Sequence, residues 1–432
     1  MLKQKCNVKP DHRSQMIAMN ILPSRFLRIT STNNQLVKRL ERLRTSKVER
    51  QKQGSVLVQG IKTLEELVSK GHHRIRTIGI TFDEQNTPIQ SPALEVVASV
   101  QRQEQDTLQR EQKQRGQEPP QHQYRYGEVA NKASITGQTR YKADQYVAMS
   151  RSLTTKILGT DSPTAEHEVW AEIAIPNYEH LFSNLSTSHR HLQKTRLGPG
   201  NDKDSSGTEA SRDPAQANRE IRRLLVLDQI SDPGNMGLII RSAMAFSWDA
   251  AWHTFGTVDP YNDKVVRASR ALCLDWPTKT GSWAELEMVL ESHGLTLLVA
   301  DMMPSRVLNQ GLPSMFKNDE TPRPHGYDEH LNPHQLVWWN WPASLPRSKV
   351  PKKIALVMSS EHHGVTISAK ASDENQEAKK RLLQNAIRVS IPMNPAVESM
   401  NVAAAATTMM WELNRIFGEK EAVMQPKLQI LC

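Results

Sequence analysis

Apolar runs and polar turns alternate regularly through the second half of the chain. Short apolar runs predict these strands: Leu224–Asp228, Ala250–Phe255, Thr296–Asp301, Ile354–Met358 and Arg388–Ile391. Apolar residues at helical spacing predict these helices: Gly237–Ser247, Asp263–Arg270, Trp283–Ser292 and Ser399–Ile416. Strands that alternate with helices indicate an α/β domain, with a mostly parallel sheet covered by helices on both faces.

The first half opens with a basic helix, in which Leu36, Leu40 and Leu43 recur at helical spacing. Cations occupy many of the remaining positions of this segment: Lys38, Arg39, Arg42, Arg44, Lys47, Arg50 and Lys52. They form either a solvated face or a set of phosphate contacts whose affinity would depend strongly on salt. The ordered segments expected after it are Ser55–Val58, Thr63–Lys70, Ile75–Thr81, Gln145–Leu153 and His167–Pro176.

Changes in composition divide the chain into segments. We expect a basic extension over 1–25, a smaller α/β domain over 26–176, a linker rich in Ser, Gly and Asp over 177–220, a larger α/β domain over 221–420 and a tail over 421–432. A Gln-rich stretch at about 101–124 is either a solvated helix or an insertion without fixed structure. An irregular insertion at about 303–349 carries Trp338, Trp339 and Trp341, which either pack on the domain or stack on unpaired bases.

Charge and cysteine content narrow the class of protein. The 432 residues carry a net charge of +9, which favours a polyanionic partner. Cys6, Cys273 and Cys432 lack C-x-x-C spacing, so we expect reduced thiols and no metal site. No apolar run reaches the roughly 18 residues of a membrane span. The basic, acid-poor N-terminus fits either a mitochondrial transit segment or a basic tail of a cytoplasmic or nucleolar protein.

The stretch from Leu224 to Trp252 is the first with candidate chemistry, because a strand, a polar turn and a helix follow one another. Asp232 and Pro233 favour the turn, and Asn235 is a candidate N-cap. Gly237 lets another backbone approach closely. We expect Arg241 within the first two helical turns, where a cation needs an anionic partner, either a carboxylate or a phosphate.

Two later stretches also place polar residues after expected strands. Ile354–Gly364 reads IALVMSSEHHG, and the chain from Arg388 reads RVSIPMNPAVESMNV. The second ends a strand at Ile391 in a Pro-containing turn, and Ser399 is a candidate N-cap for a helix over Met400–Arg415. Because ligands bind beyond the carboxyl ends of strands in open α/β sheets, we expect these turns to surround one site.

In order and character the three stretches resemble the motifs of the SpoU (TrmH-like) branch of the SPOUT RNA methyltransferases. The first motif is complete: Asp228, Asp232, Pro233, Asn235, Gly237, Ile239 and Arg241. The second keeps Glu361 and Gly364, but Ser359 and His362 replace glycines. The third is nearly complete, although Pro395 replaces a glycine: Ile391, Pro392, Met393, Ser399, Met400, Asn401 and Val402. The segment from Arg28 resembles the opening of an L30e-like RNA-binding domain, with Gln59 in place of a glutamate.

This resemblance implies a SPOUT fold with a deep trefoil knot and an RNA 2′-O-ribose methyltransferase that uses S-adenosylmethionine (AdoMet). The implied catalytic residues are Asn235, Arg241, Glu361, Ser399 and Asn401. The implied cofactor-binding residues are Ser359, Gly364, Ile391, Met393 and Met400. The implied RNA contacts are Lys38, Arg39, Arg42, Arg44, Lys47, Arg50 and Arg267. Family members act as homodimers on rRNA or tRNA, with the site near the interface, and the N-terminal pattern favours large-subunit rRNA.

Two rival interpretations remain open. An RNA-binding ribosome-assembly factor that kept the fold and lost turnover would explain Ser359, His362 and Pro395. A nucleotide-dependent enzyme would use 232–237 as a phosphate loop, but this turn has neither the G-x-G-x-x-G nor the G-K-S/T pattern. The sequence therefore favours methyl transfer to RNA over both alternatives.

Overall fold

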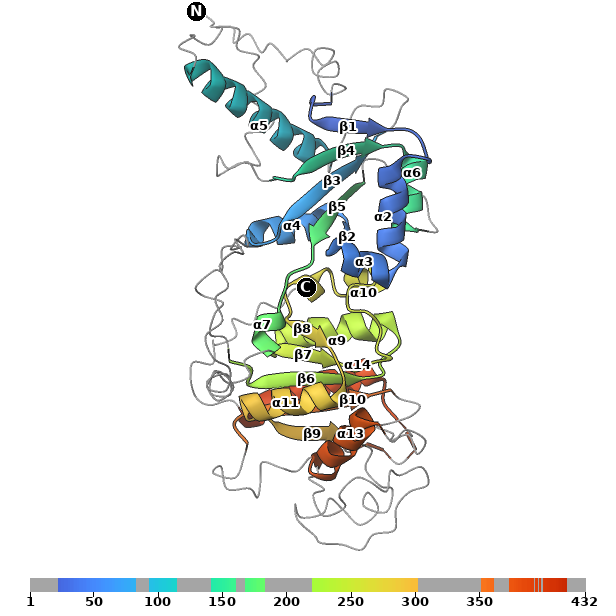
Figure 1. Ribbon diagram of the computed structural model, residues 1–432, viewed down its shortest axis with the longest axis vertical. Coiled ribbons are helices and arrows are strands. Elements are labelled where there is room, and N and C mark those ends of the chain that lie inside the picture. Colours follow the sequence, from blue (N-terminus) through green and yellow to red (C-terminus); the bar gives the residue numbers. More distant parts are fainter. Residues whose placement is uncertain are drawn as a thin grey trace, which may run out of the picture. The chain divides into compact units, whose positions relative to one another are not determined.

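The computed structural model describes residues 22–82, 93–114, 141–160, 168–182, 220–301, 351–360 and 373–417, except Pro392, Pro395 and Glu398. Contacts between residues divide the chain into two units. One runs to Pro176 and also includes Tyr261–Asp263, and the other comprises the remainder from Asn177. Each unit is built on one sheet (Figure 1). Among the described residues, no helix has the length and apolar character needed to cross a membrane.

The N-terminal unit contains a mixed five-stranded sheet in the order β1-β4-β3-β5-β2. Its strands are β1 (Phe26–Ile29), β2 (Ser55–Gln59), β3 (Ile75–Thr81), β4 (Gln145–Met149) and β5 (Val169–Ala174). Its helices are α2 (Gln35–Thr45), α3 (Lys47–Gln53), α4 (Ile61–Lys70), α5 (Ala93–Gln114) and α6 (Arg151–Leu158). β5 runs antiparallel to β2 and β3, whereas β1, β3 and β4 are parallel.

Helix α2 forms because its apolar residues lie on one side and its N-terminus is capped. Val37, Leu40 and Leu43 are buried and join the core that includes α6. Asn34 accepts a hydrogen bond from the Leu36 N–H and so begins the helix. The predicted amphipathic helix is therefore confirmed. The Gln-rich stretch is helical as far as Gln114, which agrees with the solvated-helix alternative for that part.

The C-terminal unit contains a six-stranded sheet in the order β11-β9-β10-β6-β7-β8, and every described strand pair is parallel. Its strands are β6 (Arg223–Asp228), β7 (Ala250–His253), β8 (Thr278–Thr280), β9 (Thr296–Ala300), β10 (Ile354–Ser359) and β11 (Ile387–Val389). Its helices are α7 (Glu179–Phe182), α9 (Pro233–Ala245), α10 (Asp263–Ala268), α11 (Trp283–His293), α13 (Glu374–Gln384) and α14 (Val402–Phe417), with a short 3-10 turn at Leu272–Leu274.

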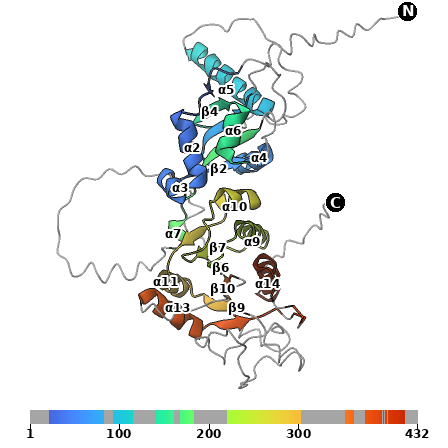
Figure 2. The ribbon, with the colours of Figure 1, turned by 90° about the vertical axis from the view of Figure 1, so that its right-hand side faces the viewer.

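Helices cover both faces of this sheet, as the strand–helix alternation predicts. Figure 2 shows α9 and α14 on one side of the strands and α11 and α13 on the other. Leu224 and Val226 of β6 face the α11 side, where they pack in one buried cluster with Leu286 and Leu383. The strands are apolar on both faces because both faces are buried. The α/β class with a mostly parallel sheet is confirmed.

Some element bounds differ from the prediction. β8 and α13 carry few apolar residues and were not expected from the hydrophobic pattern. Helix α9 begins at Pro233, four residues before the predicted start, because Asp232 provides the cap and proline suits the first helical position. Helix α14 begins at Val402 rather than at Ser399. The predicted trefoil knot stays a prediction.

Gly237 lies where α9 meets the end of α10. A Cβ added at Gly237 would lie 2.3 Å from the Ala268 Cβ and 2.9 Å from the Ser269 backbone nitrogen. This bears out the expected close approach. We expect Gly237→Ala to lower the free energy of unfolding by about 1–3 kcal/mol, because a packed backbone must shift to admit the methyl group. Urea denaturation measures the loss.

The matched control for that variant is Gly234→Ala in the first turn of the same helix. There the added Cβ would lie 3.1 Å from the Asp232 Oδ1, a side-chain atom that can move. A smaller loss at Gly234 than at Gly237 is expected. Equal stability of Gly237→Ala and the parent protein would contradict the packing described here.

Candidate active site

The carboxyl ends of β6 and β10 meet at one edge of the C-terminal sheet. Asp228, the last residue of β6, lies opposite Ser359, the last residue of β10. The first and second sequence motifs therefore leave the sheet side by side. This edge is where a parallel α/β sheet places its ligand-binding turns.

A buried ion pair holds the end of β6. The Lys379 ammonium lies 3.1 Å from the Asp228 Oδ2, and both side chains are almost completely buried. Thr254 donates a second hydrogen bond to Asp228 over 2.6 Å, and Lys379 lies 5.1 Å from the centre of the Trp283 ring. The sequence pattern gives no indication of Lys379, because α13 shows only a weak apolar stripe. We describe Lys379 as a positioning residue for the turn that follows β6.

Asp232, and not Asn235, is the N-cap of α9. The Asp232 Oδ1 accepts a hydrogen bond from the Asn235 N–H over 2.7 Å. The prediction that Asn235 caps the helix is therefore wrong. The correction changes the role of Asn235, since its side-chain amide is available for contacts outside its own helix.

Asn401, and not Ser399, caps α14. The Asn401 Oδ1 accepts hydrogen bonds from the N–H groups of Ala403 and Ala404 over 3.0 and 3.3 Å. The Asn401 Nδ2 in turn donates to the Asn235 Oδ1 over 3.0 Å. One side chain thus caps a helix and joins the third motif to the first. Residues separated by 166 positions meet as the spacing of the motifs predicts.

The contact between α9 and α14 continues along both helices. The hydroxyl groups of Ser242 and Thr407 lie 2.7 Å apart. Further along, the Asn414 Nδ2 donates to the Phe246 carbonyl over 2.6 Å. Both helices therefore run in the same direction and bring their N-termini to the same end. Two helix N-termini side by side favour bound negative charge.

Arg241 does not lie on the α14-facing line of α9. It is exposed, in the third helical turn, so the expected position beside the positive helix end is wrong. Leu238 and Ala245 are also exposed and share its side of the helix. Among the described residues, no hydrogen bond or ion pair engages the Arg241 guanidinium. The interpretation of Arg241 as one half of a salt bridge within this chain therefore loses support.

Comparison with known proteins identifies the segment that holds this arrangement. The model of the SpoU rRNA methylase family matches residues 222–411, which include β6, α9, β10 and most of α14. Residues 222–411 are therefore similar to the SpoU rRNA methylase family. This match confirms the resemblance seen in the three motifs, while the L30e-like assignment of the N-terminal unit stays a prediction.

Individual relatives agree with the family match. The mitochondrial rRNA methyltransferase 3A of Danio rerio is 26% identical over 201 residues, 44% of this chain and 43% of the relative. The mitochondrial rRNA methyltransferase 3 of Homo sapiens is 25% identical over 216 residues, 46% of this chain and 48% of the relative. The matched part of the chain thus spans about half the length of these curated relatives.

A solved structure extends the similarity in fold to most of the chain. The crystal structure of an AdoMet-bound rRNA methyltransferase from Sinorhizobium meliloti covers 90% of this chain and 98% of its own, with a TM-score of 0.51 and 16% identity. At this identity the similarity concerns the fold. It confirms the predicted fold class.

Four of the implied cofactor-binding residues of the SpoU segment fall within the described part of the chain. Ser359 ends β10, and the apolar side chains of Ile391, Met393 and Met400 are half-buried. Ser399, an implied catalytic residue, is exposed beside Met400. Glu361 and Gly364 lie outside the described residues, as do His362 and Pro395.

The implied RNA contacts of the N-terminal unit divide into two groups. Arg50 is buried and donates to the carbonyl oxygens of Leu43 and Arg44, so it stabilises the turn between α2 and α3 and cannot meet RNA. Arg39 pairs with Glu172 over 2.7 Å, but its side chain is 26% exposed, so it stays a candidate contact. Lys38, Arg42 and Lys47 are exposed, Arg44 is half-buried, and Arg267 in the SpoU segment is exposed. The basic helix therefore offers fewer phosphate contacts than its sequence predicts.

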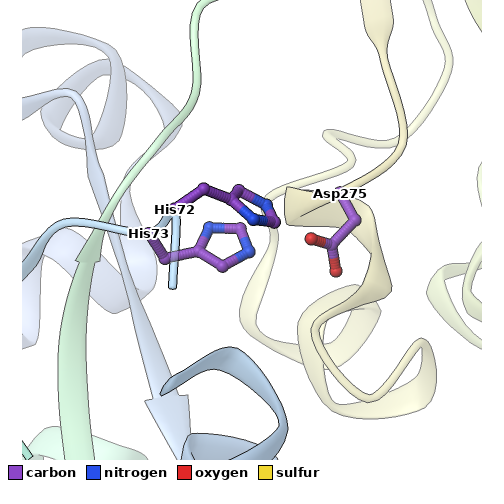
Figure 3. Close-up of side chains that lie close together, drawn as sticks. All are labelled: His72, His73 and Asp275. Carbon is purple, nitrogen blue, oxygen red and sulfur yellow. The ribbon is translucent and has the colours of Figure 1, made fainter. Parts of the chain in front are cut away.

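Among the described residues, neither unit by itself contains three side chains placed to bind one metal ion. The imidazole rings of His72 and His73 lie close together, with centroids 4.1 Å apart (Figure 3). Two histidines fall short of the three or four protein ligands of a zinc site, and Asp275, also drawn there, belongs to the other unit. Burial raises the pKa of the Cys273 thiol to about 12, so this thiol is protonated at neutral pH.

Two substitutions at Asn401 separate its two roles. Asn401→Ala removes the cap, and we expect the free energy of unfolding to fall by about 1–2 kcal/mol. Asn401→Asp keeps a capping oxygen but cannot donate to Asn235, so stability should be retained while methyl transfer falls. Thermal unfolding and a methyl-transfer assay on the same samples measure the two effects. Full activity of a stable Asn401→Asp protein would show that methyl transfer does not require the hydrogen bond donated by the Asn401 amide to the Asn235 oxygen.

Proposed function

We propose that the chain is an AdoMet-dependent RNA methyltransferase that methylates a ribose 2′-hydroxyl of structured RNA, with large-subunit rRNA as the expected substrate. The observation that carries the proposal is the hydrogen bond between Asn235 and Asn401 at the carboxyl edge of the sheet. It joins two motifs of the SpoU segment, and both residues were implied to be catalytic from the sequence. Relatives named as rRNA methyltransferases support the choice of RNA.

The reaction requires that a weakly acidic hydroxyl attack an electrophilic methyl carbon. AdoMet would supply the methyl group to the ribose oxygen, S-adenosylhomocysteine would be the product released, and the hydroxyl proton would pass to solvent. Arg241 is suited to hold the target phosphate or to stabilise the negative charge that develops on the ribose oxygen, because its guanidinium is exposed and stays charged. Proximity of the two reactants supplies much of the acceleration in such a transfer.

The residues at the sheet edge fit the chemical character of AdoMet. Ile391, Met393 and Met400 offer half-buried apolar surface for an adenosyl group. Asn235 and Asn401 lie at paired helix N-termini and offer polar groups beside that surface. AdoMet would supply the methyl group, and these side chains would hold and orient it. The AdoMet-bound relative from Sinorhizobium meliloti supports the assignment.

We further propose that the protein acts as a homodimer with the site near the interface. Leu238 on α9 and Trp411 on α14 are unusually exposed for apolar residues, and Trp411 packs beside Phe246 with ring centroids 5.6 Å apart. Such a surface is typical of an interface. Because Arg241 and Leu238 lie on the same exposed face of α9, association of two copies would bury the surface around Arg241.

A mitochondrial location is the last part of the proposal. The relatives from Danio rerio and Homo sapiens are named mitochondrial. The first 28 residues carry six cations and one acid, as transit segments do. Fluorescence imaging of a C-terminally tagged chain tests this location independently of activity.

The experiment that tests the function is a map of ribose methylation across cellular RNA in a deletion strain and its parent. The proposal expects one or a few 2′-O-methyl groups to disappear, from large-subunit rRNA, and to return when the gene is restored. An unchanged map would contradict it. Loss of a 2′-O-methyl group from tRNA would support the proposed activity but would identify tRNA as the substrate.

The rival function is an RNA-binding assembly factor without turnover, for which Ser359, at the end of β10 in place of a glycine, is the relevant observation. Calorimetric titration with AdoMet separates the two. Saturable AdoMet binding favours the methyltransferase. A folded protein that binds RNA but releases no heat with AdoMet at several temperatures favours the assembly factor.

A further inference from the structure

A polar cleft of about 300 Å³ opens on the N-terminal unit beside the basic helix α2. It lies where α2 meets the first residues of β3 and β4. Its lining comprises three arginines, two acids and two neutral polar residues: Arg39, Arg74, Arg76, Thr77, Asp144, Gln145 and Glu172. Neither Arg74 nor Arg76 was singled out from the sequence.

Arg39 is fixed at the cleft by a buried network. Its guanidinium donates two hydrogen bonds of 2.7 Å to the carboxylate of Glu172. Ser55 and Thr77 donate to the same carboxylate over 2.7 and 3.2 Å. Burial alone would raise the pKa of Glu172, but these bonds, with Arg39 foremost, hold it below its ordinary value. Glu172 is 1% exposed, so its charge is directed at Arg39 and not at the solvent.

A β-bulge turns Arg76 toward the same cleft. Ile75 pairs with Ile173 and Thr77 pairs with Glu172, so Arg76 is an extra residue on β3. Bulges re-aim side chains and are frequent at functional sites. The Arg76 guanidinium donates to the Gln53 carbonyl over 2.6 Å, which fixes its position from one side.

Arg74 is the third and most exposed cation of the cleft. It donates to the Asp144 Oδ2 over 3.0 and 3.2 Å, and its side chain is 72% exposed. The bonds described use two N–H groups each of Arg39 and Arg74 and one of Arg76, whereas a guanidinium carries five. Donors therefore remain for a ligand after the anchoring contacts are made.

We infer that this cleft binds a phosphate of the RNA backbone, with Arg39, Arg74 and Arg76 as the donors. Guanidinium groups held from one side match the geometry of phosphate oxygens, and anchoring in advance reduces the entropy lost on binding. The exposed Lys38 and Arg42 on α2 extend the positive surface of this unit along the same helix. The inference rests on the proposed function, which supplies RNA as the partner.

Fluorescence anisotropy with a labelled transcript of a large-subunit rRNA domain tests the inference on the full chain. We expect Arg76→Gln to lower the slope of log affinity against log salt by about 0.9. If the variant and the parent bind equally at about 1 M KCl, this change of slope makes the variant bind about eightfold more weakly at about 0.1 M KCl. Arg76→Lys keeps the charge and the reach to Gln53, so its salt slope should stay close to that of the parent.

The matched control is Arg102→Gln, an exposed arginine on α5 that does not line the cleft. It should change affinity and salt slope little. Substitution of inorganic phosphate for chloride at constant ionic strength should weaken RNA binding by the parent more than by Arg76→Gln. If folded Arg76→Gln binds the transcript with the affinity and the salt slope of the parent, the inference is overturned.

Calorimetry with AdoMet on the same variants distinguishes failure of this inference from failure of the proposed function. Normal AdoMet binding and methyl transfer, together with cleft variants that bind RNA as the parent does, would reject the cleft alone. Absent AdoMet binding, together with RNA affinity that depends on Arg76, would reject the methyltransferase and keep the cleft.

Discussion

Replacing Lys379 with methionine is expected to lower the free energy of unfolding by about 3–5 kcal/mol, because it leaves a buried carboxylate without its counterion. Lys379 and Asp228 are both almost completely buried, and their charged atoms are 3.1 Å apart. Among the described side chains, Thr254 alone would then donate a hydrogen bond to Asp228. Denaturation with guanidinium chloride, followed by tryptophan fluorescence, measures the loss, since Trp252 and Trp283 are buried in this unit.

Two further variants make that prediction specific. Lys380→Met changes the neighbouring, half-buried lysine of the same helix and should have a small effect. Asp228→Asn combined with Lys379→Met removes both charges and should recover part of the stability. If Lys379→Met lowers the free energy of unfolding no more than Lys380→Met does, the ion pair does not hold the end of β6.

Replacing Arg241 with alanine is expected to reduce the rate of methyl transfer by about 10²–10³-fold while AdoMet affinity changes little. The reason is that the proposed function assigns its guanidinium to the RNA phosphate or to the developing charge of the ribose oxygen, and no described bond uses it to hold the fold. Single-turnover transfer of a tritiated methyl group measures the rate, and calorimetry measures the affinity.

Arg415→Ala is the control for Arg241, since Arg415 is exposed in the last turn of α14 and pairs only locally with Glu412. It should retain nearly full activity. Arg241→Lys keeps the charge but not the paired donors, so an intermediate rate is expected. Near-normal turnover of Arg241→Ala would remove Arg241 from the mechanism.

Much of the fold was predictable because hydrophobic pattern and burial agree. The central strands β6 and β10 are apolar runs since both of their faces are covered. β8 consists of Thr278, Lys279 and Thr280 at the sheet edge, so it gave no apolar signal. Helix α13 buries only a few residues, one of which is the charged Lys379, and a lysine on a predicted helix is expected to be solvated.

The candidate site was predictable in its members but not in its contacts. Sequence order brought Asn235 and Asn401 into one proposal, and the structure joins them by a hydrogen bond. The sequence could not reveal which residue caps each helix. Asp232 and Asn235 are both suitable caps for α9, and Ser399 and Asn401 are both suitable caps for α14. The cations of α2 and α3 looked equivalent in sequence, yet Arg50 is buried and Lys47 is exposed. Tertiary packing determines which residue caps a helix and which cation is buried, and residue spacing in the sequence does not reveal it.

The central claim is that the sheet edge marked by Asn235 and Asn401 transfers a methyl group from AdoMet to a ribose. The most direct measurement incubates the purified chain with tritiated AdoMet and a large-subunit rRNA transcript, and then separates the nucleosides after complete digestion. The account predicts tritium in a 2′-O-methylated nucleoside, and loss of that signal in Arg241→Ala. Tritium on a base, or none from a folded protein that binds the transcript, would contradict it.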